Sequence, residues 1–197
     1  MELQICGVSK TYSGGVRALN NVSLTVSQGM FGLLGPNGSG KTTLMRTIAT
    51  LQDPDVGTVL LGKADVQSNK ATVRQRLGYL PQDFGVYPSV SAYNMLTHLA
   101  TLKGITQRRQ RRSSVESLLR CTNLWNVRKK PLGTFSGGMK RRFGIAQALL
   151  GKPELVMVDE PTAGLDPEER VRFLNLLSEI SEKAIVILST HIVEDVS

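Results

Sequence analysis

The stretch Met30-Phe-Gly-Leu-Leu-Gly-Pro-Asn-Gly-Ser-Gly-Lys-Thr42 carries the strongest structural signal in this chain of 197 residues. Residues 30–34 form a continuous apolar run, which predicts a β-strand buried on both faces. Gly35 to Thr42 match the phosphate-loop pattern G-x-x-x-x-G-K-[ST], and a helical pattern follows from Lys41 to about Leu51. Strand, glycine-rich loop and helix in this order predict an α/β fold that binds a nucleotide.

The loop residue types suit the binding of a phosphorylated ligand. Glycines let successive backbone N–H groups turn inward, and the helix start adds its partial positive charge. Lys41 is expected to reach the β- and γ-phosphates, and the Thr42 hydroxyl to hold Mg²⁺. A plain glycine-rich turn with an exposed lysine is the alternative, but the flanking strand and helix argue against it. The predicted nucleotide-binding residues here are Gly35, Pro36, Asn37, Gly38, Ser39, Gly40, Lys41, Thr42 and Thr43.

Two further apolar runs predict central strands of a parallel sheet, at residues 155–158 and 184–188. Between them Asp166 is a good N-cap and Pro167 a good first residue for a helix. That helix is expected to bury one face, formed by Val171, Leu174, Leu177 and Ile180. Strand, helix and strand with this spacing predict a parallel α/β unit.

Shorter strand patterns occupy residues 22–26, 58–61 and 77–80. From Asp83 to Gly151 these signals disappear and helical ones dominate. We therefore expect a single domain over 1–197, with a core lobe (1–82 and 152–197) and an inserted helical lobe (83–151). The last helix of that lobe is predicted to begin near Ser136 and to stop at Gly151, just before Pro153.

Asp159 and Glu160 follow the strand at 155–158 directly. Ligands of α/β folds bind at the carboxyl ends of parallel strands. An aspartate at this position can hold Mg²⁺, while the adjacent glutamate can polarise the attacking water. A strand that leaves the core often ends in charged residues, so this pattern gains its meaning from the phosphate loop upstream.

The segment Phe135-Ser-Gly-Gly-Met139, together with these motifs, resembles the nucleotide-binding domain of ATP-binding-cassette (ABC) transporters. The resemblance covers nearly the whole chain and implies a P-loop NTPase fold. That fold has a RecA-like core with a parallel sheet, a small antiparallel β region and an inserted helical subdomain. Met139 departs from the commonest family pattern, which has glutamine at this position.

The resemblance also implies roles for residues that are uninformative singly. Tyr12 matches the aromatic residue that stacks on adenine, and Gln82 the glutamine of the loop that joins the lobes and reaches Mg²⁺ and the water. Residues 163–166, ending in Asp166, match a loop that crosses the dimer interface. His191 matches the switch histidine at the γ-phosphate. The catalytic set is then Glu160, His191 and Gln82, and the metal set Thr42, Gln82 and Asp159.

Ser136, Gly137 and Gly138 open a helix and so provide a second anion site. One chain has one ATP at Lys41, so this site calls for the ATP of another molecule. The expectation is a head-to-tail homodimer, or a pair with a second ATPase subunit, that ATP closes and hydrolysis opens. The motifs are similar to those of ATP-binding subunits of multidrug, lipid or polysaccharide exporters.

The sequence predicts an ATPase with ATP and Mg²⁺ that drives a separate transmembrane permease. No run reaches the roughly 18 apolar residues of a membrane span, and no secretory signal is evident. The expected location is therefore cytoplasmic, on the inner face of the cell membrane. Cys6 and Cys121 form no metal pattern and are expected to be structural thiols. The chain ends six residues after His191, which suggests a C-terminally truncated or unusually short domain.

The formal net charge of +8 leaves several partners open. The dense basic run at residues 103–112 fits anionic headgroups and a solvated helix surface equally well. An ABC-type ATPase that acts on nucleic acid or ribosomes is the alternative. It is less favoured because such relatives carry two cassettes or a long insertion, so no nucleic-acid partner is expected. A small-molecule kinase would share the phosphate loop but has no use for Ser136 and its glycines.

Overall fold

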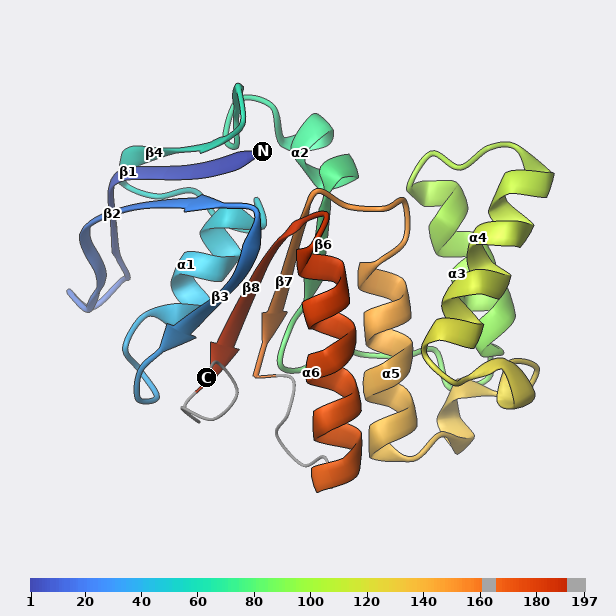
Figure 1. Cartoon of the computed structure of the whole chain (residues 1–197). Helices are drawn as coiled ribbons and strands as arrows, with labels where there is room; N and C mark the ends of the chain where they lie inside the picture. Colours follow the sequence, from blue (N-terminus) through green and yellow to red (C-terminus); the bar gives the residue numbers. More distant parts are fainter. Residues whose placement is uncertain (161–165, 191–197) are drawn as a thin grey trace.

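The computed structural model describes residues 1–160 and 166–190, which form two sheets and a set of flanking helices (Figure 1). The strands are β1 (Glu2–Thr11), β2 (Arg17–Ser27), β3 (Gly29–Leu34), β4 (Val56–Leu61), β5 (Ala64–Asp65), β6 (Leu77–Leu80), β7 (Leu155–Asp159) and β8 (Ile185–Thr190). The α-helices are α1 (Lys41–Ile48), α2 (Lys70–Arg76), α3 (Ala92–Leu102), α4 (Arg108–Cys121), α5 (Gly137–Ala148) and α6 (Pro167–Ser181). Two short 3₁₀ turns, Trp125–Val127 and Leu132–Thr134, connect α4 to α5.

The central sheet has the order β3-β8-β7-β6, and every pair is parallel. All residues of β7 and β8 are buried, as expected for strands covered on both faces. Together with the phosphate loop after β3, this sheet confirms the predicted P-loop α/β fold. The carboxyl ends of β3 and β7 lead directly into the predicted site residues.

The burial predicted for residues 30–34 is wrong. Within the described sheet β3 pairs with β8 alone, its residues are at most half-buried, and Leu34 is 51% exposed. An apolar run does not tell an edge strand from a central one, because burial depends on which other elements cover it.

The second sheet confirms the predicted antiparallel region, with the order β2-β1-β4-β5. Its inner face and the central sheet both pack on α1, in one apolar cluster. That cluster includes Leu3 and Ile5 of β1, Met45 and Ile48 of α1, and Ile187 of β8. The packing holds the helix that follows the phosphate loop between the two sheets.

Helix α6 begins as predicted. Asp166 is its N-cap, with Oδ1 accepting a hydrogen bond from Glu169 N at 2.8 Å, and Pro167 is its first residue. The predicted buried face is partly wrong, because Val171 is 57% exposed while Phe173 and Leu177 are buried. A spacing of three residues drifts around a helix with 3.6 residues per turn, so its first member has rotated away from the core.

Helices α3, α4 and α5 share an apolar cluster that includes Leu96, Val115, Leu119 and Phe143. We refer to residues 83–151 as the helical lobe, which remains the division proposed from the sequence. Figure 1 shows α3 and α4 beside α5 and away from the two sheets. Within the described chain, no helix combines the length and apolar character that crossing a membrane would require.

Helix α5 also packs against the central sheet, where Ile145 and Ala148 join Leu80 of β6 in a third cluster. The approach is close, since a Cβ on Gly78 would lie 2.1 Å from the Ala148 carbonyl oxygen. Helix α5 therefore connects the parallel sheet to the other helices of the helical lobe.

Candidate functional site

The phosphate loop turns sharply between β3 and α1. Gly38 and Gly40 have φ angles of +81° and +92°, a region that favours glycine. Position 40 also has no room for a side chain, because a Cβ there would lie 2.4 Å from the Ala18 carbonyl oxygen. Lys41 Nζ donates hydrogen bonds to the carbonyl oxygens of Gly35 at 2.6 Å and Pro36 at 3.0 Å. Its ammonium group is thus held directly against the loop.

A cavity of about 370 Å³ lies over this loop and collects residues from four separate segments. It is lined by Tyr12, Val16, Arg17, Ala18, Asn37, Gly38, Ser39, Gly40, Lys41, Thr42, Thr43, Gln82 and Glu160. The structure therefore brings together most of the residues predicted to bind nucleotide and two of the predicted catalytic ones. Sequence reasoning missed residues 16–18, for which the Gly14-Gly15 turn after Tyr12 was the available signal.

Tyr12 borders the cavity and is 40% exposed as a residue. Its hydroxyl donates to Gln52 Oε1 at 2.9 Å and lies 3.3 Å from Thr43 Oγ1. Gln52 Nε2 in turn donates to the Thr43 carbonyl at 2.9 Å. The hydroxyl is therefore held from the side of α1, which leaves the ring at the edge of the cavity. Stacking on adenine stays a prediction.

Asp159, the last residue of β7, is only 1% exposed. Ser189 Oγ of β8 donates a short hydrogen bond to its Oδ1. The other oxygen, Oδ2, is buried and has no hydrogen-bond partner among the residues that the structure describes. A buried carboxylate oxygen without a partner is costly unless a ligand satisfies it.

Glu160 lines the cavity, whereas Asp159 is absent from its lining. The φ angle of Glu160 is +44°, an uncommon value for a residue with a side chain, and its N–H donates to both the carbonyl and Oγ of Ser189 at 3.1 Å. Its Oε2 accepts a hydrogen bond from Gln82 Nε2 at 2.8 Å. The turned backbone thus sends two consecutive carboxylates to different places.

Arg141 of α5 is a site residue that sequence reasoning missed. Its Nη1 donates to the Gln82 carbonyl at 3.0 Å, and its Nη2 donates a short hydrogen bond to the Glu160 carbonyl. Burial lowers the pKa of this guanidinium, and the nearby carboxylates of Asp83, Glu160 and Asp159 oppose that shift. No local pattern distinguishes Arg141 from Lys140 and Arg142, because its partners are distant in sequence.

Ser136, Gly137 and Gly138 line no part of the nucleotide cavity of their own chain. Helix α5 begins beside Ser136 as predicted, and Ser136 is its N-cap, with Oγ accepting from Met139 N at 3.2 Å. A Cβ on Gly137 would meet nothing within 4 Å, so the first turn is open on that side. Met139 packs against the apolar cluster of the helical lobe.

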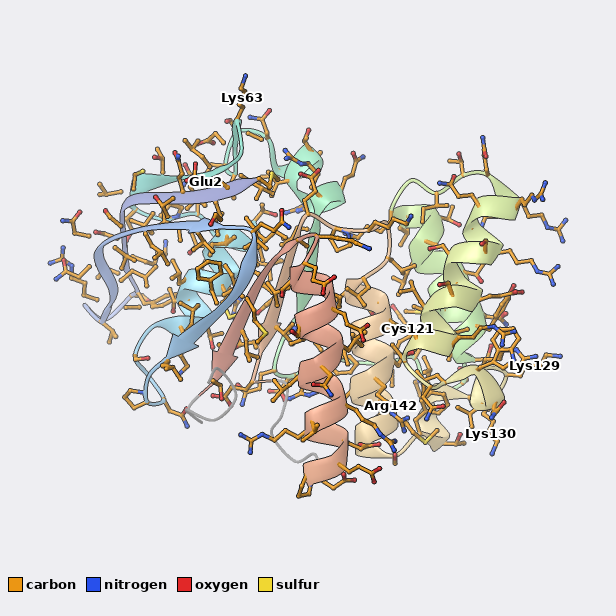
Figure 2. All side chains as sticks on the ribbon, in the orientation of Figure 1. Glu2, Lys63, Cys121, Lys129, Lys130 and Arg142 are labelled. Carbon is orange, nitrogen blue, oxygen red and sulfur yellow. The ribbon has the colours of Figure 1, made fainter. Side chains whose placement is uncertain are left out.

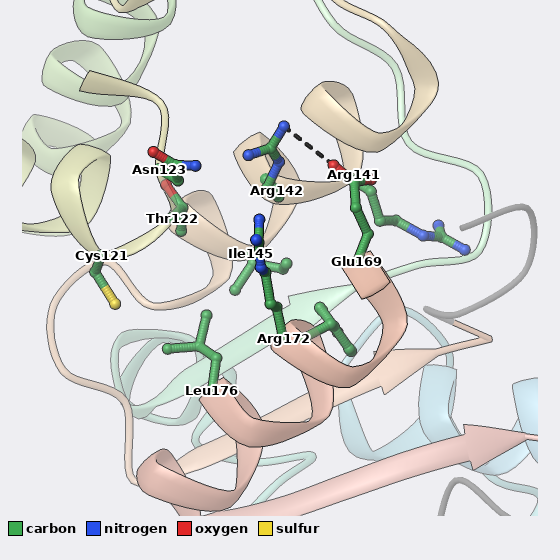
Figure 3. A pocket seen from close by; sticks show the side chains of 10 residues that line it. Cys121, Thr122, Asn123, Arg141, Arg142, Ile145, Glu169, Arg172 and Leu176 are labelled. Atoms are coloured by element: carbon green, nitrogen blue, oxygen red, sulfur yellow. Dashed lines mark ion pairs between the residues drawn. The ribbon is translucent and has the colours of Figure 1, made fainter. Parts of the chain in front are cut away.

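Gly138 has an additional packing role, because a Cβ there would lie 2.0 Å from Glu169 Oε2 of α6. Glu169 Oε1 also forms an ion pair with Arg142 Nη2 at 3.2 Å. Both residues line a small cavity between α5 and α6 (Figure 3). The starts of α5 and α6 are therefore joined by close packing and by charge.

His191 and residues 163–165 of the predicted interface loop lie outside the described residues, so their predicted roles stay predictions. Asp166 is described, and its side chain caps α6.

Comparison with known proteins agrees with this geometry. The family model described as "ABC transporter" matches residues 19–163. A linearmycin resistance ATP-binding protein from Bacillus subtilis is 35% identical over 98% of this chain and 62% of its own length. A doxorubicin resistance ATP-binding protein from Mycobacterium tuberculosis is 38% identical over 96% of this chain and 58% of its own length. The chain thus spans about three fifths of these relatives.

Among solved structures, the ATP-binding cassette MJ0796 in a dimeric post-hydrolysis state with ADP and Pi superposes with a TM-score of 0.89. It is 26% identical, and the match covers 98% of this chain and 89% of the cassette. The family match covers most of the chain and includes the phosphate loop, Gln82 and Glu160, which line the cavity described above. The chain therefore belongs to the ABC transporter family.

Proposed function

We propose that the chain binds ATP and hydrolyses it to ADP and phosphate. One observation carries this: Lys41, Gln82 and Glu160, far apart in sequence, line a single cavity over a phosphate-binding loop. A cationic side chain for phosphates and a carboxylate for water are the parts that phosphoryl transfer to water requires.

The roles follow from the contacts. Lys41 Nζ donates hydrogen bonds to loop carbonyl oxygens. On ATP binding it would exchange them for stronger, charge-assisted hydrogen bonds to phosphate oxygens. Glu160 is oriented through both its backbone and Gln82, so its carboxylate can accept a proton from, or polarise, the attacking water. Gln82 would respond to the γ-phosphate because its amide already contacts the Glu160 carboxylate, which would lie beside that phosphate.

The residues present also fit Mg²⁺. Asp159 offers a buried carboxylate oxygen that lacks a partner in the described part of the chain, and Thr42 offers a hydroxyl in the cavity. Oxygen donors of this kind suit a hard divalent cation. Thr42, Gln82 and Asp159 would hold the ion, which would supply charge neutralisation at the phosphates when bound.

The geometry further favours a head-to-tail dimer. Ser136 and Gly137 are exposed at the N-terminus of α5, where the first backbone N–H groups lie outside the helical hydrogen-bond ladder. Since they do not reach the cavity of their own chain, a second subunit is needed to use them on ATP. The solved cassette MJ0796 is itself described as dimeric.

For the whole protein we propose the role of the ATP-binding subunit of an exporter, peripheral on the cytoplasmic face of the membrane beside a separate permease. The relatives named for antibiotic resistance support export. A groove of about 540 Å³ runs between the core and helical lobes, and it is flanked by two exposed leucines, Leu51 (55%) and Leu102 (71%). We assign this groove to a permease helix, because its surface is mostly apolar and it touches both lobes.

The direct test is phosphate release from Mg-ATP by the 197-residue chain. We expect turnover that EDTA abolishes and that Lys41→Ala eliminates, with ATP affinity lowered about 100-fold through loss of charge-assisted bonds. Lys63→Ala is the matched control, since Lys63 is exposed and does not line the cavity. Unchanged ATP affinity in Lys41→Ala would show that the cavity is not the nucleotide site.

A further inference from the structure

The charge of the chain is distributed very unequally between its two lobes. Residues 83–151 contain 12 basic and two acidic side chains, a net charge of +10. The other 128 residues contain 12 basic and 14 acidic side chains, a net charge of −2. The helical lobe therefore accounts for the positive net charge of the chain. An anionic surface would attract this lobe and weakly repel the rest of the chain.

Part of this charge lines one groove, of about 900 Å³, between α4 and the segments that flank it. We call it the arginine groove and define it by Arg112, Glu116, Arg120, Trp125, Arg128 and Lys129. Among the described residues that line it, Glu116 is the single carboxylate, and Arg112 pairs with it at 2.8 Å. Three further cations line the groove together with that pair.

Two of these cations are fixed in place. Arg120 and Arg128 lie on the Trp125 ring, each with its guanidinium carbon 3.8 Å from the ring centroid. Arg128 Nη1 also donates to the Trp125 carbonyl at 2.7 Å. Guanidinium groups held in this way lose little side-chain entropy on binding a phosphate. The groove is therefore preorganised for a phosphate ligand.

The lysines that follow extend the same surface outward. Lys129 and Lys130 are exposed, and Figure 2 shows both projecting from the helical lobe on the side away from the two sheets. Basic clusters of this density bind anionic headgroups, with about 1 kcal/mol from each charge close to the membrane surface.

We propose that the arginine groove is a docking site for the anionic phospholipid headgroups of the membrane. Nucleic acid is less favoured because single strands bind largely by stacking bases on aromatic rings, and the Trp125 ring is already occupied by two guanidinium groups. The choice of a lipid surface also rests on the proposed transporter role, which places the chain at a membrane. The contact orients the helical lobe toward the bilayer.

The test is cosedimentation of the 197-residue chain with phosphatidylcholine vesicles, with and without phosphatidylglycerol, in the absence of nucleotide. We expect binding that requires phosphatidylglycerol and weakens with salt. Arg120→Gln/Lys129→Gln should weaken it about 25-fold, since each charge contributes about fivefold. The matched control Lys63→Gln/Lys183→Gln removes the same charge from exposed sites outside the groove and should change binding less than about twofold.

Equal losses in the two double variants, or binding that is indifferent to phosphatidylglycerol, would overturn the proposal. So would tighter binding of a single-stranded oligonucleotide than of vesicles at the same salt. The groove shares no lining residue with the nucleotide cavity, so Arg120→Gln/Lys129→Gln should keep its ATPase activity in solution. Vesicle binding by a chain that fails to hydrolyse ATP would refute the proposed ATPase alone.

Discussion

At the scale of single residues, the site depends on two carboxylates that are adjacent in sequence and separated in space. The left-handed backbone of Glu160 is held by two hydrogen bonds to Ser189. Asp159 stays buried beneath it, with one oxygen bonded to Ser189. This turn underlies the proposed division of roles, in which Asp159 would hold a metal ion and Glu160 would polarise water.

Glu160→Gln tests this division of roles. The amide keeps the shape of the side chain but cannot accept a proton, so turnover should fall at least about 100-fold while ATP affinity changes little. Phosphate release and equilibrium ATP binding are the two measurements. Turnover equal to that of the wild type would remove Glu160 from the mechanism.

Arg141 is expected to act as a positioning residue, since its guanidinium joins the Gln82 and Glu160 carbonyls. Arg141→Gln should lower kcat by about tenfold or more, with the KM for ATP nearly unchanged, because a small displacement of the carboxylate suffices. Lys140→Gln is the matched control on the same helix. A rise in KM without a fall in kcat would indicate a role in binding instead.

At the scale of elements, the contact between α5 and β6 transmits position from the sheet to the helical lobe. Gly78 and Ala148 approach so closely that no side chain fits between them. The same helix carries Ser136 at its start and Arg141 one turn later. The candidate nucleotide site and the proposed dimer surface are therefore linked through one helix.

Gly78→Ala should destabilise the chain by about 1–3 kcal/mol, because the new methyl group meets a backbone carbonyl that cannot rotate away. Urea unfolding monitored by circular dichroism gives the difference. Gly85→Ala is the control, since a Cβ there meets nothing within 4 Å, and it should stay within about 0.5 kcal/mol of the wild type. Equal stability of the two variants would mean that α5 and β6 pack less tightly than described.

At the scale of the whole molecule, the phosphate loop and the start of α5 at Ser136 line no common cavity within the described part of one chain, and we propose that they are two halves of a shared ATP site. The cavity over the phosphate loop excludes Ser136, and the first turn of α5 is open beside Gly137. In the proposed head-to-tail dimer, a second copy in the opposite orientation would complete both sites at once.

The solution mass of the Glu160→Gln chain should therefore change from monomer to dimer when Mg-ATP is added, as measured by light scattering. Ser136→Glu in the same background should stay monomeric with ATP bound, because a carboxylate repels the partner's phosphates. Ser113→Glu, an exposed position on α4, should leave the dimer intact. A monomer at saturating ATP in the Glu160→Gln chain would contradict the shared site.

Features with local causes were predictable from the sequence. The phosphate loop, the caps at Ser136 and Asp166 and the start of α6 at Pro167 all depend on contacts within a few residues. The parallel sheet was predictable too, because apolar runs that alternate with a helix pattern have few other arrangements.

Other features were decided only by the tertiary structure. The edge position of β3, the outward turn of Val171, the bridge formed by Arg141 and the stacking of Arg120 and Arg128 on Trp125 have no signature in the residues themselves. The chemistry of the motifs and the type of fold follow from the sequence alone, because both arise from neighbours along the chain. Which strand is covered and which cation meets which carbonyl depend on packing between segments far apart in the chain, so only the folded molecule decides them.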